Sequence, residues 1–199
     1  MALKFDGPTG ATPLGPEELD GLIPTHISER RELDEWESRN ILKAEQWLQG
    51  RSLTGILTVA FVKRLHKRMF DETWKWAGTF RTTEKNIGID PIHIQVRVKD
   101  LCEDVKTQLA HKSMQLDEIA AMFHHRLVSI HPFANGNGRH ARLMTDMLLL
   151  TNGAERFTWG SGELNDDNQI RERYIAALRA ADNRDHKPLF GFVRTRKKT

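Results

Sequence analysis

The chain has 199 residues, a formal net charge of +3 and a single cysteine, Cys102. One cysteine excludes an intrachain disulfide framework and any metal site that needs two thiolate ligands. No run approaches the roughly 18 uninterrupted apolar residues of a membrane-spanning helix, and the N-terminal segment lacks the pattern of a secretory signal. The 30 basic and 27 acidic residues are too balanced to indicate a nucleic-acid partner. We therefore expect a cytoplasmic globular protein, with a membrane partner excluded and nucleic acid disfavoured.

In the N-terminal half, glycine and proline crowd residues 1–16, which predicts an irregular arm. Apolar residues then recur near a 3.6-residue period over residues 28–49 and again over 54–69, so both stretches are predicted helices. The segment that follows is different, because turn-forming residues separate two short alternating runs at 79–82 and 93–98. This alternation predicts a small β-hairpin.

In the C-terminal half, helical periodicity returns in four stretches: residues 99–112, 116–129, 139–150 and 165–181. A short apolar patch follows at residues 189–193, before a basic end. The pattern as a whole predicts an all-α bundle with one hairpin.

One segment of the chain carries the features of a chemical site. A predicted helix ends at His131, the loop after it contains Gly136 and Gly138, and another helix begins at Arg139. Backbone N–H groups at a helix N-terminus bind anions, and glycine lets a ligand approach them closely. Arg139 and Arg142 can each bind phosphate oxygens in pairs, and a histidine can accept a proton near neutral pH. We interpret the segment as a phosphate cradle with a general base; a plain glycine turn flanked by solvated arginines is the alternative.

The whole run from His131 to Arg142, His-Pro-Phe-Ala-Asn-Gly-Asn-Gly-Arg-His-Ala-Arg, closely resembles the signature motif of the Fic/Doc family. Agreement over so many defined positions is improbable by chance. Two further segments are similar to parts of that family. Trp76–Gly88 resembles the start of its hairpin flap, and Arg173–Leu189 resembles its C-terminal core helix.

The resemblance divides the chain into three parts. Residues 1–49 would form an N-terminal arm and helix, residues 50–195 a Fic-like catalytic core, and residues 196–199 a basic tail. The implied fold is all-α, a Fic-type helical bundle with a small β-hairpin flap and an N-terminal helical extension. Within that extension, Trp36-Glu37-x-x-Asn40 resembles the subgroup called mobile mystery protein B.

Family members with this motif core transfer AMP from ATP to a hydroxyl side chain of a target protein and release pyrophosphate. The resemblance implies that His131 takes the proton from the attacking Ser, Thr or Tyr hydroxyl. Phe133 would anchor the loop, and Asn137 would hydrogen-bond an α- or β-phosphate oxygen. The nucleotide-binding set is then Phe133, Gly136, Asn137, Gly138, Arg139 and Arg142. In such chemistry, positioning and electrostatics supply most of the catalysis.

Asn135 departs from the family pattern, which usually has Asp or Glu there to bind Mg²⁺. An asparagine offers one neutral carbonyl oxygen, whereas Mg²⁺ is normally held by carboxylates and substrate phosphates. The resemblance implies ATP as substrate with Mg²⁺ or Mn²⁺, and Asn135 would be a weak metal ligand. A different nucleotide donor, or a non-catalytic nucleotide-binding regulatory module, is therefore an alternative.

Two other classes of function are weighed against AMP transfer. The phosphorylating branch of the family has Lys at the position of Gly138, so this glycine favours AMP transfer over phosphotransfer. A DNA-binding helical protein ranks last, because the one dense basic run is the C-terminal tail.

The resemblance also implies an inhibitory helix. Such helices carry the pattern Ser/Thr-x-x-x-Glu-Gly/Asn, and their glutamate pairs with the second motif arginine, here Arg142. Ser28 and Glu32 match this pattern except that Leu33 follows, so Glu32 is the first candidate. Glu37 is the second candidate, although Leu33 then stands where Ser or Thr is expected.

The resemblance also implies roles for the flap and for partner proteins. Ile87, Gly88 and Ile89 would dock the target segment on the flap as an added strand. An ordinary hairpin that covers the core is the alternative. The subgroup resemblance implies a toxin-like protein with a small antitoxin or helix-turn-helix partner.

Overall fold

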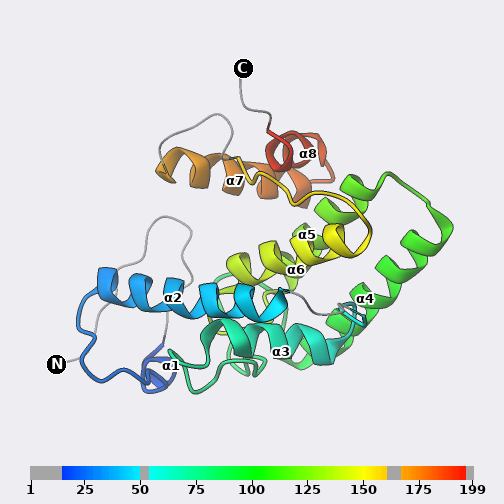
Figure 1. The fold of residues 1–199 in the computed structure, drawn as a ribbon. Helices are drawn as coiled ribbons and strands as arrows, with labels where there is room; N and C mark the ends of the chain where they lie inside the picture. Colours follow the sequence, from blue (N-terminus) through cyan, green and yellow to red (C-terminus); the bar gives the residue numbers. More distant parts are fainter. Residues whose placement is uncertain (1–14, 50–53, 161–166, 196–199) are drawn as a thin grey trace.

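The computed structural model describes residues 15–49, 54–160 and 167–195, and its regular elements in these ranges are helices (Figure 1). Most of the predicted N-terminal arm and all of the predicted tail at 196–199 lie outside the described residues. In chain order the elements are α1 (Pro16–Leu19), α2 (Arg30–Leu48), α3 (Val59–Phe70), the 3₁₀ turn η1 (Pro91–His93), α4 (Ile94–His111), α5 (Leu116–Ile130), α6 (Asn137–Thr151), α7 (Asp167–Asp182) and α8 (Lys187–Val193).

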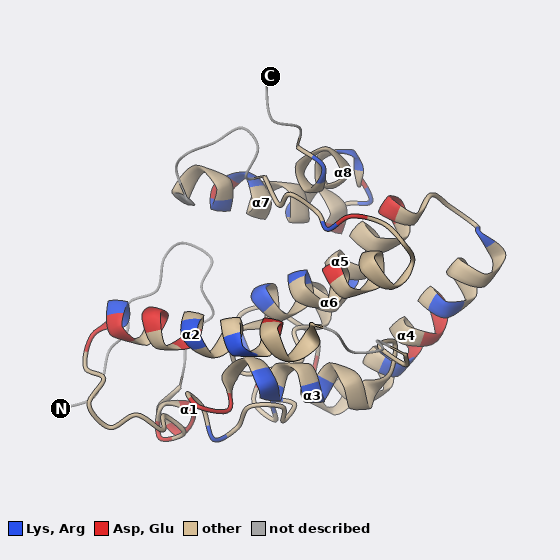
Figure 2. Cartoon of the chain, in the orientation of Figure 1, with Lys and Arg blue, Asp and Glu red and all other residues tan. Residues whose placement is uncertain are grey.

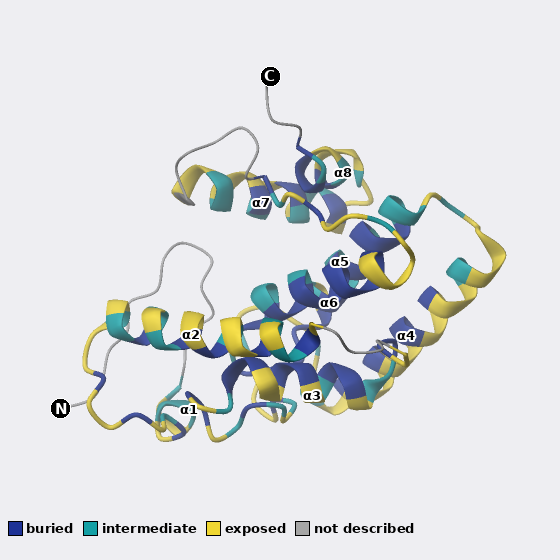
Figure 3. Cartoon of the chain, viewed as in Figure 1, coloured by how far each residue is buried: buried dark blue, intermediate teal, exposed yellow. Residues whose placement is uncertain are grey.

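Helices α5 and α6 form the centre of the molecule, and most of their residues are buried (Figure 3). Helix α3 packs against both α6 and α2, while α4 packs against α5 and α3. Helices α7 and α8 pair with each other, and α8 also contacts α5. The loop that joins α5 to α6 is therefore anchored in the core at both of its ends.

Local sequence explains where several helices begin and end. Thr58 precedes α3, and its hydroxyl accepts a hydrogen bond from the Phe61 N–H at 3.2 Å, the usual role of an N-cap threonine. At the start of α5 the Glu118 carboxylate accepts from the Gln115 N–H at 3.2 Å. Lys112 ends α4 in the left-handed conformation, with φ of 48°. The predicted all-α bundle is confirmed, and each predicted helix has a counterpart.

The predicted β-hairpin is wrong. The described residues contain no strand and only an isolated bridge between Leu22 and Trp74. Residues 79–90 are irregular, and the second predicted strand, residues 93–98, lies mostly in α4.

The physical reason for this error is the spacing of the buried residues. Ile94 and Val98 continue into Leu101, Cys102 and Val105, which together form one helical face. Val96, which completed the alternating pattern, is 57% exposed on the opposite side. The Asp90 side chain accepts from the Ile92 N–H at 3.0 Å and caps the 3₁₀ turn η1, which leads directly into α4.

Charged residues of both signs lie along the surface of α2 and α4 (Figure 2). Several are paired one turn apart, as in Arg30 with Asp34 at 2.9 Å. Such exposed pairs contribute little to stability. No helix in the described ranges is long and apolar enough to cross a membrane.

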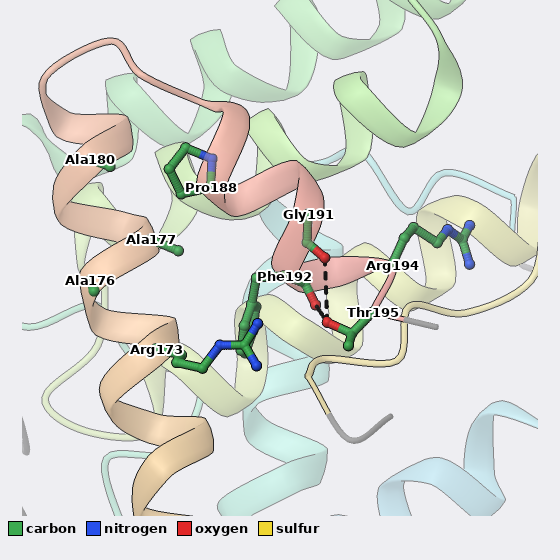
Figure 4. A pocket seen from close by; sticks show the side chains of 9 residues that line it. All are labelled: Arg173, Ala176, Ala177, Ala180, Pro188, Gly191, Phe192, Arg194 and Thr195. Atoms are coloured by element: carbon green, nitrogen blue, oxygen red, sulfur yellow. Dashed lines mark hydrogen bonds between the residues drawn. The ribbon is translucent and has the colours of Figure 1, made fainter. Parts of the chain in front are cut away.

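A groove of about 560 Å³ lies between α7 and α8 (Figure 4). Its floor consists of small residues of α7 and of α8: Ala176, Ala177, Ala180, Pro188 and Gly191. The Thr195 hydroxyl closes one side by donating to the Phe192 carbonyl at 2.8 Å. None of the lining residues belongs to the segment 131–142.

Candidate active site

The loop between α5 and α6 has a backbone shape that its sequence dictates. His131 ends α5 in the left-handed conformation, with φ of 53°. Gly136 starts α6 with φ of 78°, and a Cβ there would lie 2.5 Å from Cζ of Phe70. A glycine is therefore required at position 136 for both conformation and space. With these two left-handed residues, the chain ends α5 at His131 and begins α6 after a loop of only a few residues.

His131 is only 4% exposed. Burial, and then the nearby charges of Arg81 and Lys85, lower its pKa from 6.5 to about 4. The imidazole is therefore neutral at physiological pH, which is the form that can accept a proton.

Arg81 ties the segment after α3 to the His131 loop. Its Nε donates to the His131 carbonyl at 2.7 Å, and its two other guanidinium nitrogens donate to the carbonyls of Thr83 and Ile89. Its backbone N–H also donates to the Pro132 carbonyl at 2.9 Å. One buried arginine thus fixes the predicted flap against the loop that carries His131.

The flap residues themselves lie beside the histidine. Gly88 has φ of 104°, and a Cβ there would lie 2.6 Å from Cβ of His131. The Ile89 N–H donates to the Ile130 carbonyl at 3.4 Å, and Ile87 is 46% exposed. The predicted docking set is thus placed next to His131, on an irregular segment rather than on a strand.

Phe133 and Asn137 brace the loop from inside. Phe133 is fully buried and stacks on His66, with the ring centroids 3.7 Å apart. The Asn137 side chain accepts from the Phe133 N–H at 2.9 Å and donates to the Phe133 carbonyl at 2.8 Å. Asn137 thus uses both of its polar atoms to shape the loop.

Asn135 is the position at which the resemblance implies a metal ligand. Its side-chain oxygen accepts a hydrogen bond from the Gly136 N–H, and its backbone carbonyl faces Nε2 of His66 at 3.0 Å. The described residues include no group of three or more His, Cys, Asp or Glu side chains that could hold a metal ion. One neutral, already hydrogen-bonded oxygen is a poor fit for Mg²⁺.

Arg139 is paired with Glu37 of α2. Its Nη1 donates to the Glu37 carboxylate at 2.7 Å, and the other oxygen of that carboxylate accepts from the Trp74 indole N–H, also at 2.7 Å. Glu37 is 1% exposed, whereas the Arg139 side chain is 33% exposed. Of the two predicted glutamates, the structure brings only Glu37 to the motif arginines.

The expected pairing of Glu32 with Arg142 is wrong. The exposed Glu32 carboxylate accepts from the backbone N–H groups of Ser28 and Glu29, at 2.9 and 3.2 Å. It is held there because a carboxylate at a helix N-terminus satisfies free N–H groups. These contacts turn Glu32 toward the start of its own helix.

Arg142 lies over aromatic rings. Its guanidinium carbon is 4.5 Å from the Tyr174 ring centroid and 5.9 Å from that of Trp159. Its Nε is buried and has no hydrogen-bond partner within the described residues. Tyr174 is in turn fixed by His124, whose Nε2 lies 2.9 Å from the tyrosine hydroxyl. A half-buried guanidinium with an unused Nε donor is suited to bind an anion.

Three residues with a part in this site were not singled out from the sequence: Arg81, Trp74 and Arg171. Burial, and then the charges of Arg142 and Arg139, lower the pKa of Arg171 on α7. Arg171 therefore adds positive charge to the motif arginines. The sequence Gly78-Thr-Phe80-Arg81 marks Arg81 as the start of the flap, whereas no motif marks Arg171.

Comparison with known proteins finds a family match over the part of the chain that carries this site. The Fic/DOC family model matches residues 56–149. "Protein adenylyltransferase fic-1" of Caenorhabditis elegans is 28% identical over 123 residues, covering 59% of this chain and 22% of the relative. "Protein adenylyltransferase Fic" of Nematostella vectensis is 28% identical over 152 residues, covering 69% of this chain and 31% of the relative. The chain thus spans less than a third of the length of these relatives.

Solved structures share the fold. The N-terminal Fic domain of a VirB-translocated Bep effector protein from Bartonella quintana, solved with bound ADP, superposes with a TM-score of 0.68. It is 20% identical, and the match covers 85% of this chain and 86% of that domain. The histidine loop, the flap and the arginine pair therefore belong to a Fic/DOC family domain, which this chain contains at residues 56–149.

Proposed function

We propose that this chain is a protein adenylyltransferase, which transfers AMP from ATP to a Ser, Thr or Tyr hydroxyl of a target protein. The observation that carries the proposal is the placement of neutral, buried His131 beside the glycine-started N-terminus of α6. That arrangement offers a proton acceptor and an anion site within one loop. The names of the curated relatives and the ADP bound to the Bartonella quintana domain support it.

The proposed reaction follows from this placement. The imidazole of His131 accepts the proton of the target hydroxyl while its oxygen forms a bond to the α-phosphorus of ATP. The bond from that phosphorus to the oxygen that bridges to the β-phosphate breaks, and pyrophosphate leaves. Arg139 and Arg142 offset the charge on the outer phosphates, together with N–H groups of α6. Asn137 contributes by holding the loop rather than by a free side chain.

Mg²⁺ or Mn²⁺ would supply additional charge neutralisation at the phosphates when bound. The only side chain that the loop offers it is Asn135, whose oxygen already accepts from Gly136. This donor set fits the metal poorly, and the proposed roles of His131, Arg139 and Arg142 do not depend on a bound metal.

The test is incubation with ATP labelled at the α-phosphate and, separately, at the γ-phosphate, with wild-type protein and His131→Ala. Protein label from the α-phosphate alone, lost in His131→Ala, supports AMP transfer. Label from the γ-phosphate contradicts it and indicates phosphotransfer. ATP binding without either label, in Glu37→Gln as well as in the wild type, would instead favour a nucleotide-binding regulatory module, the alternative that Asn135 motivates.

Glu37 is the proposed inhibitory residue. While it holds Arg139 at 2.7 Å, that guanidinium is not free to bind a phosphate. Glu37→Gln keeps an acceptor for Trp74 but removes the charge, so we expect labelling to rise between about 5- and 150-fold, the range of typical coupling energies. The initial rate of α-label incorporation measures this.

Glu32→Gln is the matched control for that measurement. Glu32 lies on the same helix, but its carboxylate accepts from the N–H groups of Ser28 and Glu29 rather than from a motif arginine, so its substitution should leave the rate unchanged. An equal rise in both variants, or none in Glu37→Gln, would reject inhibition by this pair.

We also propose where the target protein binds and what kind of partner the chain has. A target segment would lie against Ile87, Gly88 and Ile89, which adjoin His131. The subgroup resemblance supports a toxin-like role with a small antitoxin or helix-turn-helix partner, in the cytoplasm. Co-purification of the chain with a small helix-turn-helix protein from its native cells would test the partner.

A further inference from the structure

His66 is a fully buried histidine on α3, outside the motif segment. Its ring stacks on Phe133 at an interplanar angle of 18°. The same ring has a polar contact at each nitrogen: Nδ1 with the Gly78 N–H at 3.0 Å, and Nε2 with the Asn135 carbonyl at 3.0 Å. One side chain therefore contacts both the start of the flap and the loop that follows His131.

These contacts fix the protonation state of the ring. The Gly78 N–H is a donor, so Nδ1 of His66 must be the unprotonated acceptor. Nε2 then carries the hydrogen and donates it to the Asn135 carbonyl. Burial lowers the pKa of His66 well below 6.5, which agrees with a neutral ring. A protonated ring would lose the bond from Gly78.

The two attachment points have little freedom of their own. Gly78 has φ of 80°, and a Cβ there would lie 2.9 Å from the Lys63 carbonyl, so its backbone is pressed against α3. In the loop, Asn135 immediately precedes Gly136, the residue that starts α6. The ring thus connects a fixed part of α3 to the residue before the proposed anion site.

We propose that His66 is a positioning residue for AMP transfer, and this rests on the proposed function above. Its ring holds Phe133 and the Asn135 carbonyl, so that His131 and the N-terminus of α6 keep their relative position. A displacement of about 1 Å can reduce a rate about 100-fold. His66 contacts neither phosphate nor hydroxyl in this scheme, so its loss should reduce kcat more than it weakens ATP binding.

Two amide variants separate the two contacts. In His66→Gln the amide nitrogen can reach the place of Nε2 and keep the bond to Asn135, but the acceptor for Gly78 is lost. In His66→Asn the amide oxygen can replace Nδ1 and keep the bond from Gly78, but the bond to Asn135 is lost. Both variants lose the stacked ring, and a difference between them therefore reports on the two hydrogen bonds and not on the stacking.

The experiment combines three measurements in the Glu37→Gln background. The first is the initial rate of α-label incorporation. We expect kcat to be about 100-fold below the parent in His66→Asn and within about tenfold of the parent in His66→Gln. The KM for ATP should change by less than a factor of about three in both variants. Amide hydrogen exchange should show a protected Gly78 N–H in His66→Asn and an unprotected one in His66→Gln. Nitrogen chemical shifts of His66 in the parent should show the Nε2-protonated form from pH 5 to 8.

His125→Gln is the matched control. His125 lies on α5, and its Nε2 contacts the Asp182 carboxylate at 2.7 Å rather than the loop. Its substitution should not change kcat by more than about twofold. Equal kcat losses in the Gln and Asn variants, or a His66 that titrates between pH 5 and 8, would overturn the positioning role. A parent that transfers no label would instead overturn the proposed function, and the exchange pattern would still decide whether His66 holds the loop.

Discussion

At the scale of single residues, the site is shaped by side chains that bind backbone groups. Arg81 binds the carbonyls of His131, Thr83 and Ile89, and Asn137 binds both polar groups of Phe133. These contacts need no ligand, so the loop already has its shape in the free protein. Preorganisation of this kind reduces the cost of assembling a transition state.

Asn135 gives the clearest prediction at this scale. Asn135→Asp places a carboxylate at the start of α6, where the helix dipole favours negative charge and where a divalent cation would gain a charged ligand. We expect the Mg²⁺ concentration for half-maximal α-label incorporation to fall roughly tenfold, a typical effect of a change at a metal ligand shell. A Mg²⁺ titration at fixed ATP measures it.

Asn135→Ala is the comparison for this titration. If the wild-type amide is a weak ligand, the Ala and wild-type curves should nearly coincide while the Asp curve is displaced. Coincidence of all three curves would show that no metal ligand acts from position 135.

At the scale of elements, sequence periodicity predicted the helices correctly but predicted the wrong structure for the segment between α3 and α4. The apolar faces of α3 and α5 repeat over their whole lengths. Residues 93–98, taken alone, alternate as a strand would. Only the continuation to Leu101 and Val105 shows that Ile94 belongs to a helical face.

The site, like the fold, could be predicted from the sequence only in part. The motif located His131 and the two arginines, because its positions are contiguous in sequence. The partner of Arg139 was not predictable in this way, because Glu37 reaches it only through the packing of α2 on α3 and the indole of Trp74. A local pattern centred on Ser28 favoured Glu32 instead.

The flap supplies the prediction at the element scale. Arg81→Lys keeps the charge but can replace at most one of the three hydrogen bonds to carbonyls. We expect the free energy of unfolding to fall by about 1–3 kcal/mol, because buried carbonyls lose their donors, and hydrogen exchange at Ile89 to accelerate. Denaturant unfolding and exchange mass spectrometry measure the two effects. Exchange unchanged at Ile89 would show that Arg81 does not hold the flap.

At the scale of the whole molecule, four buried histidines hold the core and the site together: His66, His124, His131 and His140. Burial is the first cause that lowers the pKa of each, to about 3 for His124 and His140 and to about 4 for His131. All four are therefore neutral in the folded protein at physiological pH. They link the stability of the whole fold to pH.

The sign of that link can be worked out. In the unfolded chain a histidine binds a proton near pH 6.5, whereas folded His140 does so only near pH 3. Between these values the unfolded state binds more protons, so the free energy of unfolding falls as pH decreases. Each such histidine contributes a slope of about 1.4 kcal/mol per pH unit.

His140→Gln should remove one of these contributions. The difference in the free energy of unfolding between wild type and this variant should shrink by about 1.4 kcal/mol for each unit that pH falls between 6 and 4.5, whatever the offset at pH 7. Urea unfolding at several pH values measures both curves. Parallel curves for wild type and His140→Gln would mean that His140 takes up its proton without unfolding, and that the core tolerates a charge beside Val62.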